Sequence, residues 1–105
     1  MTKSSGYLYS EYAIRYGYMT KEQKAHYDRV ANLGCSLCRY LSLGESPCEI
    51  HHIRRAGKRS NAPVIGLCPP HHRGNEGIHG MGRKRFEREF GITEEELLEQ
   101  TLELI

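Results

Sequence analysis

The sequence predicts an α+β fold in which helices flank a short β-hairpin. Two strand-length segments rich in apolar and β-branched residues, 48–53 and 62–67, are separated by a basic loop. Helix-start signals lie on both sides of this hairpin, at Thr20 and Thr93. Four cysteines are present, three of them in the spacing of metal ligands. Because a chain of 105 residues buries only a modest core, a bound metal is expected to help stabilise it.

The first predicted helix covers residues 20–33. Its opening TKEQ has the pattern of a capping box between Thr20 and Gln23, and Gly34 is expected to end it in a left-handed conformation. Residues 1–19 precede it as a separate arm that holds five of the seven tyrosines. These aromatic rings either pack on the domain or stack on bases and dock a partner. The chain is therefore divided into an arm, 1–19, and one domain, 20–105.

A series of helices is predicted after the hairpin. Pro69 and Pro70 suit the first positions of a helix, which places His71 and His72 at its start. Closely spaced glycines are expected to break this helix before His79, and a further helix should end at Gly91. Thr93 and Glu96 form a second capping box. In the helix after it a packing stripe is expected from Leu97, Leu98, Leu102, Leu104 and Ile105.

The cysteine spacing predicts a structural zinc site. Cys35 and Cys38 form C-x-x-C, and Cys68 and His71 form C-x-x-H thirty residues further on, at the base of the hairpin. Zinc prefers four such ligands in a tetrahedron. Cys48 is either a ligand in place of His71 or part of the core. No apolar run has the length of a signal peptide core or a membrane span, so a soluble cytoplasmic protein with reduced cysteines is expected.

Charge is distributed unevenly along the chain. Residues 50–88 contain nine Lys or Arg and only two acids, whereas the segment from Glu94 onward contains five glutamates and no base. The histidine-rich half is therefore expected to face a polyanion such as DNA. The expected DNA-binding residues are Arg54, Arg55, Lys58, Arg59, Arg83, Lys84 and Arg85.

Two His-His pairs flank the basic loop, His51-His52 before it and His71-His72 after it. A strand that ends in His-His, a loop, a second strand and a helix carrying another histidine resemble the HNH, or ββα-metal, nucleases. The motifs C-x-x-C, IHHI, IGLCPPHHRG, IH and FEREFG before an ELL helix are more narrowly similar to the phage recombination-enhancement (Ref) nucleases, which cut DNA with the help of a RecA filament.

This resemblance implies a small zinc-stabilised ββα-metal domain with flanking helices, acting on DNA in a bacterial or phage-infected cell. By motif position, His51 and His72 are ligands of a catalytic ion, Mg²⁺ or another divalent metal, and His52 is the general base. The third ligand is expected to be His79, because IH precedes the FE helix as in the Ref-like pattern. Glu76 is the alternative, because it occupies the position four residues after the first helix histidine where many HNH motifs place this ligand. Asn61 is displaced from the usual position of the motif asparagine.

Two other functions are compatible with these residues. One is a general HNH nuclease of a restriction or packaging system without a link to RecA. The other is a non-catalytic zinc module that binds DNA or a recombination protein. The favoured prediction remains a metal-dependent endonuclease that hydrolyses phosphodiester bonds in RecA-linked recombination, because a non-catalytic module has no use for a His-His pair beside a basic loop.

Overall fold

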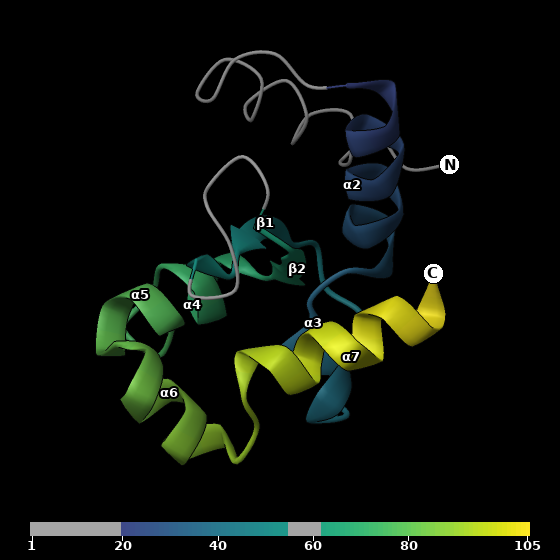
Figure 1. Cartoon of the computed structure of the whole chain (residues 1–105). Coiled ribbons are helices and arrows are strands. Elements are labelled where there is room, and N and C mark those ends of the chain that lie inside the picture. Colours follow the sequence, from purple (N-terminus) through teal and green to yellow (C-terminus); the bar gives the residue numbers. More distant parts are fainter. Residues whose placement is uncertain (1–19, 55–61) are drawn as a thin grey trace.

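A computed structural model describes residues 20–54 and 62–105 of the chain (Figure 1). In these ranges short helices surround one two-stranded sheet, so the predicted α+β class is confirmed. The Tyr-rich arm and the loop residues Arg55, Lys58, Arg59 and Asn61 lie outside the described residues.

The sheet is the predicted hairpin. Strands β1 (Glu49–His52) and β2 (Val64–Leu67) pair antiparallel, with His51 opposite Ile65. Every residue of β2 is buried, which fits its apolar sequence. Because side chains alternate along a strand, Glu49 and His51 share one face of β1 and His52 belongs to the other.

Helix α2 (Lys21–Leu33) covers one side of the hairpin and begins with the predicted capping box. The backbone N–H of Gln23 donates to the hydroxyl of Thr20, and the Gln23 side chain accepts from the Thr20 N–H, both at 3.0 Å. Gly34 ends the helix with φ 79° and ψ −161°, so the predicted positive φ is confirmed but the backbone is not left-handed helical. A Cβ at Gly34 would lie 2.7 Å from the carbonyl oxygen of Ser46, which requires glycine here.

The remaining helices before the last one are short, as the glycines predicted. Their bounds are α3 (Ser36–Tyr40), α4 (Pro69–His72), α5 (Ile78–Met81) and α6 (Arg83–Phe90). Between α4 and α5 the chain turns so tightly that a Cβ at Gly77 would lie 2.7 Å from the backbone of His71. Gly91 ends α6 in the left-handed conformation, with φ 72° and ψ 25°.

Helix α7 (Glu94–Leu104) starts with the second predicted capping box, but the predicted stripe on it is wrong in part. Leu97 is fully buried, whereas Leu102 and Leu104 are 51% and 54% exposed. The buried positions are Glu94, Leu97 and Thr101, which are spaced as one helical face. The buried Thr101 hydroxyl has a hydrogen-bond partner, because it donates to the Leu97 carbonyl at 2.8 Å.

One continuous core joins the hairpin to the helices that follow it. Its largest fully buried side chains are Phe86, Leu37, Ile53, Ile65, Leu67 and Leu97. Cys35, Cys38 and Cys68 belong to the same cluster, so the cysteine group lies in the interior of the domain. In the described part of the chain, no helix has the length and apolar character needed to cross a bilayer.

Candidate metal centres and active site

The structure brings Cys35, Cys38, Cys68 and His71 together at the base of the hairpin. The Cys38 and Cys68 sulfurs are 3.7 Å apart, and Nδ1 of His71 lies 3.6 Å and 3.3 Å from them. A zinc tetrahedron with Zn–S bonds of about 2.3 Å and Zn–N bonds of about 2.0 Å has edges of roughly 3.6–3.8 Å. The four donors therefore have the chemistry and nearly the spacing of a closed zinc site, and all four cysteines are free of disulfides.

Local structure positions the first two ligands of this group. Cys35 is the N-cap of α3, and its sulfur accepts a hydrogen bond from the Cys38 N–H at 3.3 Å. Burial raises the pKa of the Cys35 thiol to about 12. A buried thiolate there needs a cation, because burial disfavours the charged form. On the other side, the ring of Phe90 packs edge-on against His71, with centroids 5.4 Å apart.

Cys48 does not belong to this group. Its sulfur is buried and lies 3.6 Å from the Ala31 carbonyl, to which it donates. Burial raises the pKa of its thiol to about 12. Of the two sequence alternatives, the structure therefore places Cys48 in the core.

A second group consists of His51, His72 and His79, from β1, α4 and the first turn of α5. One ring nitrogen of each lies within 4.8 Å of the others. The ring centroids of His72 and His79 are 4.7 Å apart, and His51 is 5.2 Å and 5.3 Å from them. Glu76 is exposed and outside this group, so of the two candidates for a third ligand the structure brings His79 to the other histidines.

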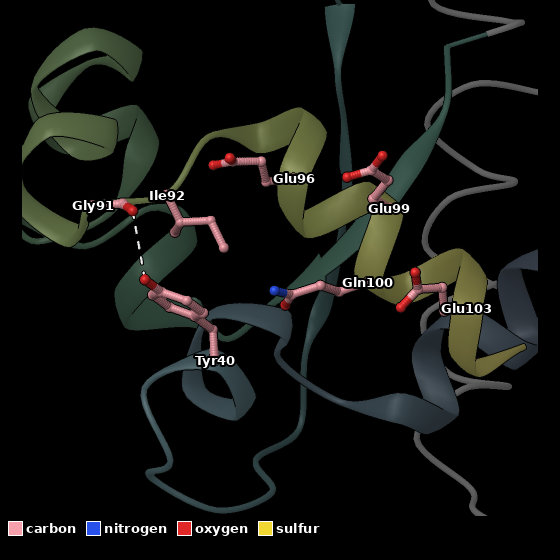
Figure 2. Close-up of a pocket in the computed structure, with 7 residues that line it drawn as sticks. All are labelled: Tyr40, Gly91, Ile92, Glu96, Glu99, Gln100 and Glu103. Atoms are coloured by element: carbon pink, nitrogen blue, oxygen red, sulfur yellow. Dashed lines mark hydrogen bonds between the residues drawn. The ribbon is translucent and has the colours of Figure 1, made fainter.

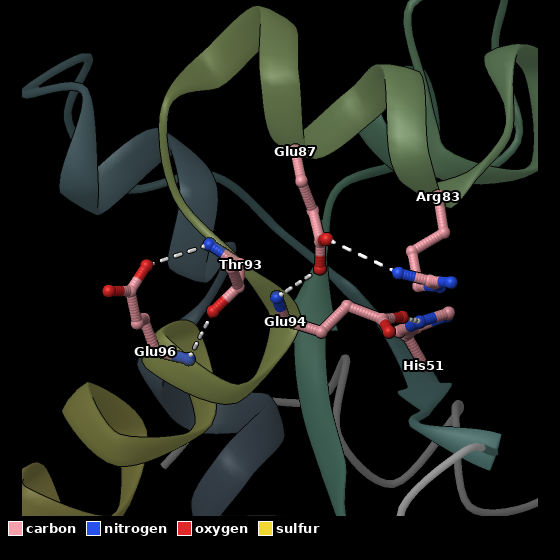
Figure 3. Close-up of polar contacts among 6 residues, drawn as sticks. All are labelled: His51, Arg83, Glu87, Thr93, Glu94 and Glu96. Carbon is pink, nitrogen blue, oxygen red and sulfur yellow. Dashed lines mark hydrogen bonds and ion pairs between the residues drawn. The ribbon is translucent and has the colours of Figure 1, made fainter.

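Two of these histidines are hydrogen-bonded to carboxylates that the sequence analysis did not single out. Nε2 of His51 donates to Oε2 of Glu94 at 2.6 Å, and both side chains are about 5% exposed (Figure 3). Nδ1 of His72 donates to Oε1 of Glu49 at 2.8 Å. A carboxylate on one imidazole nitrogen leaves the other nitrogen of the ring for a metal, an arrangement found around most ligating histidines.

The pKa values of two of these histidines, His72 and His79, are lowered, which favours cation binding. Burial lowers the pKa of His72, and the neighbouring His51 and His79 lower it further, although Glu49 acts in the opposite direction. Burial also lowers the pKa of His79, with smaller contributions from His51 and Arg54. A histidine with a lowered pKa is neutral at pH 7, and only a neutral imidazole can ligate a metal.

His52 lies outside the three-histidine group although it is adjacent to His51 in sequence. It is the last residue of β1 and is 8% exposed, and its ring meets Tyr27 of α2 edge-on with centroids 6.2 Å apart. Strand alternation explains this, because neighbouring residues point to opposite faces.

Four of the seven predicted DNA-binding residues, Arg54, Arg83, Lys84 and Arg85, lie in the described part of the chain. Arg54 is exposed, and its charge acts on His79, so a guanidinium lies close to the histidine group. Lys84 and Arg85 are exposed on α6. Arg83 is partly engaged, since it lies 3.4 Å from the Glu87 carboxylate. Of these four residues, Arg54 is the one whose charge acts on a histidine of the group.

A separate hollow of about 270 Å³ lies between α7 and Tyr40 (Figure 2). The Tyr40 hydroxyl donates to the Gly91 carbonyl at 3.5 Å, and three carboxylates line the wall, those of Glu96, Glu99 and Glu103. Like charges repel, so this hollow is unsuited to the DNA backbone. None of the seven histidine and cysteine residues of the two metal groups lines it.

Sequence reasoning missed Glu49 and Glu94 for different reasons. Glu49 is two residues before His51, so strand alternation alone placed both on one face and was a usable signal. Glu94 is separated from His51 by 43 residues, and only the packing of α7 brings them together. Within the sequence, Glu94 is one of five similar acids.

Comparison with protein families gives a match over most of the chain. A family model described as recombination enhancement, RecA-dependent nuclease, matches residues 19–105. Comparisons with curated proteins and with solved structures gave no match.

Proposed function

Because the chain belongs to the family of recombination-enhancement, RecA-dependent nucleases, we propose that it is a metal-dependent DNA endonuclease of the HNH type. The observation that carries this proposal is the grouping of His51, His72 and His79 from a strand and two short helices. Three imidazole ligands leave coordination positions for water and substrate, as catalytic sites require. The Cys3His group, by contrast, has the four donors of a closed structural zinc site.

Hydrolysis of a phosphodiester needs an activated water, neutralisation of charge on the phosphate and help for the departing 3′ oxygen. A divalent cation at the three histidines would supply the charge neutralisation when bound. By its position in the HNH-like motif, we assign His52 the removal of a proton from the attacking water, which requires that water to reach the face of β1 opposite His51. The products would carry a 5′ phosphate and a 3′ hydroxyl, as the HNH resemblance implies.

The metal in the cell is proposed to be Mg²⁺, although imidazole ligands also favour Zn²⁺, Mn²⁺ and Ni²⁺. Arg54 and the loop residues Arg55, Lys58 and Arg59 are proposed to hold the DNA backbone. Such phosphate contacts position DNA without reading its sequence. RecA dependence is a property of the family, and the phage origin follows only from the resemblance of the motifs.

The proposed function predicts cleavage that depends on both a metal and a RecA filament. Single-stranded and supercoiled DNA are incubated with the zinc-loaded protein and Mg²⁺ or Mn²⁺, with and without RecA on a complementary strand. Cuts are expected only when metal and filament are both present, because the filament is the cofactor that the family description names. A chelator added at the start should abolish them.

The same assay separates the alternatives. Equal cleavage with and without the filament would contradict the RecA link and favour a general HNH nuclease. DNA binding without cleavage under every condition would contradict the enzyme proposal and favour a non-catalytic zinc module.

The basic loop gives a second prediction, which concerns binding alone. Replacing Arg54, Arg55, Lys58 and Arg59 together by glutamine should weaken binding to all DNA sequences. The slope of log affinity against log salt should become shallower by about 0.9 for each lost phosphate contact on duplex DNA. Fluorescence anisotropy of labelled DNA at several salt concentrations measures the affinity and this slope.

The matched control for the loop replaces Arg83, Lys84 and Arg85 of α6 by glutamine. If the loop variant keeps the wild-type salt slope and the α6 variant loses it, the DNA surface lies on α6 instead. Because Arg83 is paired with Glu87, a smaller change is expected from the α6 variant.

A further inference from the structure

We propose that Glu94, the first residue of α7, is a positioning residue for His51 in the three-histidine site. This inference rests on the proposed function, since it concerns the same metal site. The carboxylate accepts a hydrogen bond from Nε2 of His51 at 2.6 Å. Because this bond engages Nε2, Nδ1 is the ring nitrogen left for a metal, and the bond fixes the orientation of the ring.

The backbone that carries the Glu94 side chain is held in place from two directions (Figure 3). The Glu94 N–H donates to Oε2 of Glu87 at 2.8 Å, and Oε1 of Glu87 lies 3.4 Å from Arg83. The capping box between Thr93 and Glu96 fixes the first turn of α7, at 2.9 Å and 3.1 Å. Helices α6 and α7 thus contribute to the metal site although neither supplies one of its three histidines.

The position of Glu94 is costly unless the carboxylate has a use. It lies on the buried face of α7 with Leu97 and Thr101 and is 4% exposed. A carboxylate taken out of water loses its solvation, which a hydrogen-bonded partner restores only when the geometry is good. An apolar side chain at this position would pack into the core without that loss. A charged group that meets His51 there is therefore better explained by the histidine than by the core.

His51 and His79 differ in this respect. Among the described residues, no carboxylate bonds to the His79 ring, and His79 is exposed. His51 is buried and is fixed by a carboxylate at hydrogen-bond distance. We therefore expect His51 to be a preorganised ligand and His79 to be the one that adjusts when an ion enters.

The first test measures metal affinity without DNA or cleavage. Protein with its Cys3His site loaded with zinc is titrated with Mn²⁺ by calorimetry, because Mn²⁺ competes poorly for thiolate ligands. Glu94→Gln should raise the Mn²⁺ dissociation constant by roughly 10–100-fold, the usual effect of losing such a partner. Glu94→Asp keeps the charge but shortens the side chain. Its Mn²⁺ dissociation constant should lie between those of the wild type and Glu94→Gln.

Glu99→Gln is the matched control, since it removes one carboxylate from the exposed side of the same helix. It should leave the Mn²⁺ dissociation constant at the wild-type value. A Glu94→Gln variant with wild-type affinity and only a lowered melting temperature would show that Glu94 is merely structural, and would overturn the inference. A wild-type protein that binds no Mn²⁺ would instead contradict the proposed metal site itself.

The second test uses the wild-type chain and so does not depend on the folding of a variant. Long-range ¹⁵N–¹H NMR of zinc-loaded, Mn²⁺-free protein reports which nitrogen of His51 carries the proton. We expect the proton on Nε2 alone. In Glu94→Gln the tautomers should mix, because an amide can donate as well as accept. A wild-type His51 with a proton on Nδ1 would overturn the inference.

Discussion

Replacing His52 by alanine is expected to reduce DNA cleavage by roughly a hundredfold or more, the usual scale for a lost general base. The structural zinc, the fold and DNA binding should persist, since His52 belongs to neither metal group. Single-turnover nicking of DNA on a RecA filament measures the loss. On the same preparation, zinc content reports on the structural zinc, thermal melting on the fold, and fluorescence anisotropy on DNA binding.

The three ligand histidines give the comparison that makes this result specific. Alanine at His51, His72 or His79 should also suppress cleavage, but by weakening metal binding. Raising the Mg²⁺ or Mn²⁺ concentration should partly rescue these variants and should not rescue His52→Ala, whose metal site is intact. Glu76→Ala is the control, because Glu76 is exposed and outside the group.

Two outcomes would contradict the assignment of His52. Undiminished cutting by His52→Ala would remove it from the mechanism. Rescue of His52→Ala by added metal would make it a ligand rather than a base. The contact between His52 and Tyr27 makes the melting measurement necessary, since alanine there also removes an aromatic contact.

The parts of the fold that could be predicted from the sequence are those set within a few residues. Both capping boxes, at Thr20 and Thr93, form as predicted because their partners lie three residues away. Gly91 ends α6 for a similarly local reason. The spacing of Cys35, Cys38, Cys68 and His71 alone predicts one metal group, because two pairs of ligands can meet in few ways.

The parts that could not be predicted depend on how distant elements pack. The sequence did not decide whether His79 or Glu76 is the third metal ligand. If the helix that starts at Pro69 continued, the four-residue spacing from His72 would favour Glu76. The chain instead leaves α4 at His72 and starts a new helix at Ile78, which carries His79 back to the site. The exposure of Leu102 and the burial of Glu94 both follow from which face of α7 packs on the core, for which the sequence has no local signal.

The second large effect is expected at the cysteine group: Cys38→Ser or Cys68→Ser should unfold the domain and release its zinc. Zinc binding to such peptides contributes about 10–16 kcal/mol at pH 7. A small domain is stable by only about 5–15 kcal/mol in total, so it cannot lose most of that contribution and stay folded. Both residues belong to the core that joins α3 to the hairpin, so the damage is not confined to one loop.

Cys48→Ser is the matched control for this prediction, because Cys48 is equally buried but lies outside the zinc group. It should keep one zinc per chain and lose only about 0.5–3 kcal/mol of stability, as single core substitutions do. Zinc content by mass spectrometry and thermal melting by circular dichroism measure both. If Cys38→Ser keeps full zinc and a native melting transition while Cys48→Ser loses them, the ligand set must include Cys48. If all three serine variants behave like the wild type, the domain is held by its apolar core alone, and the metal is not part of its folding.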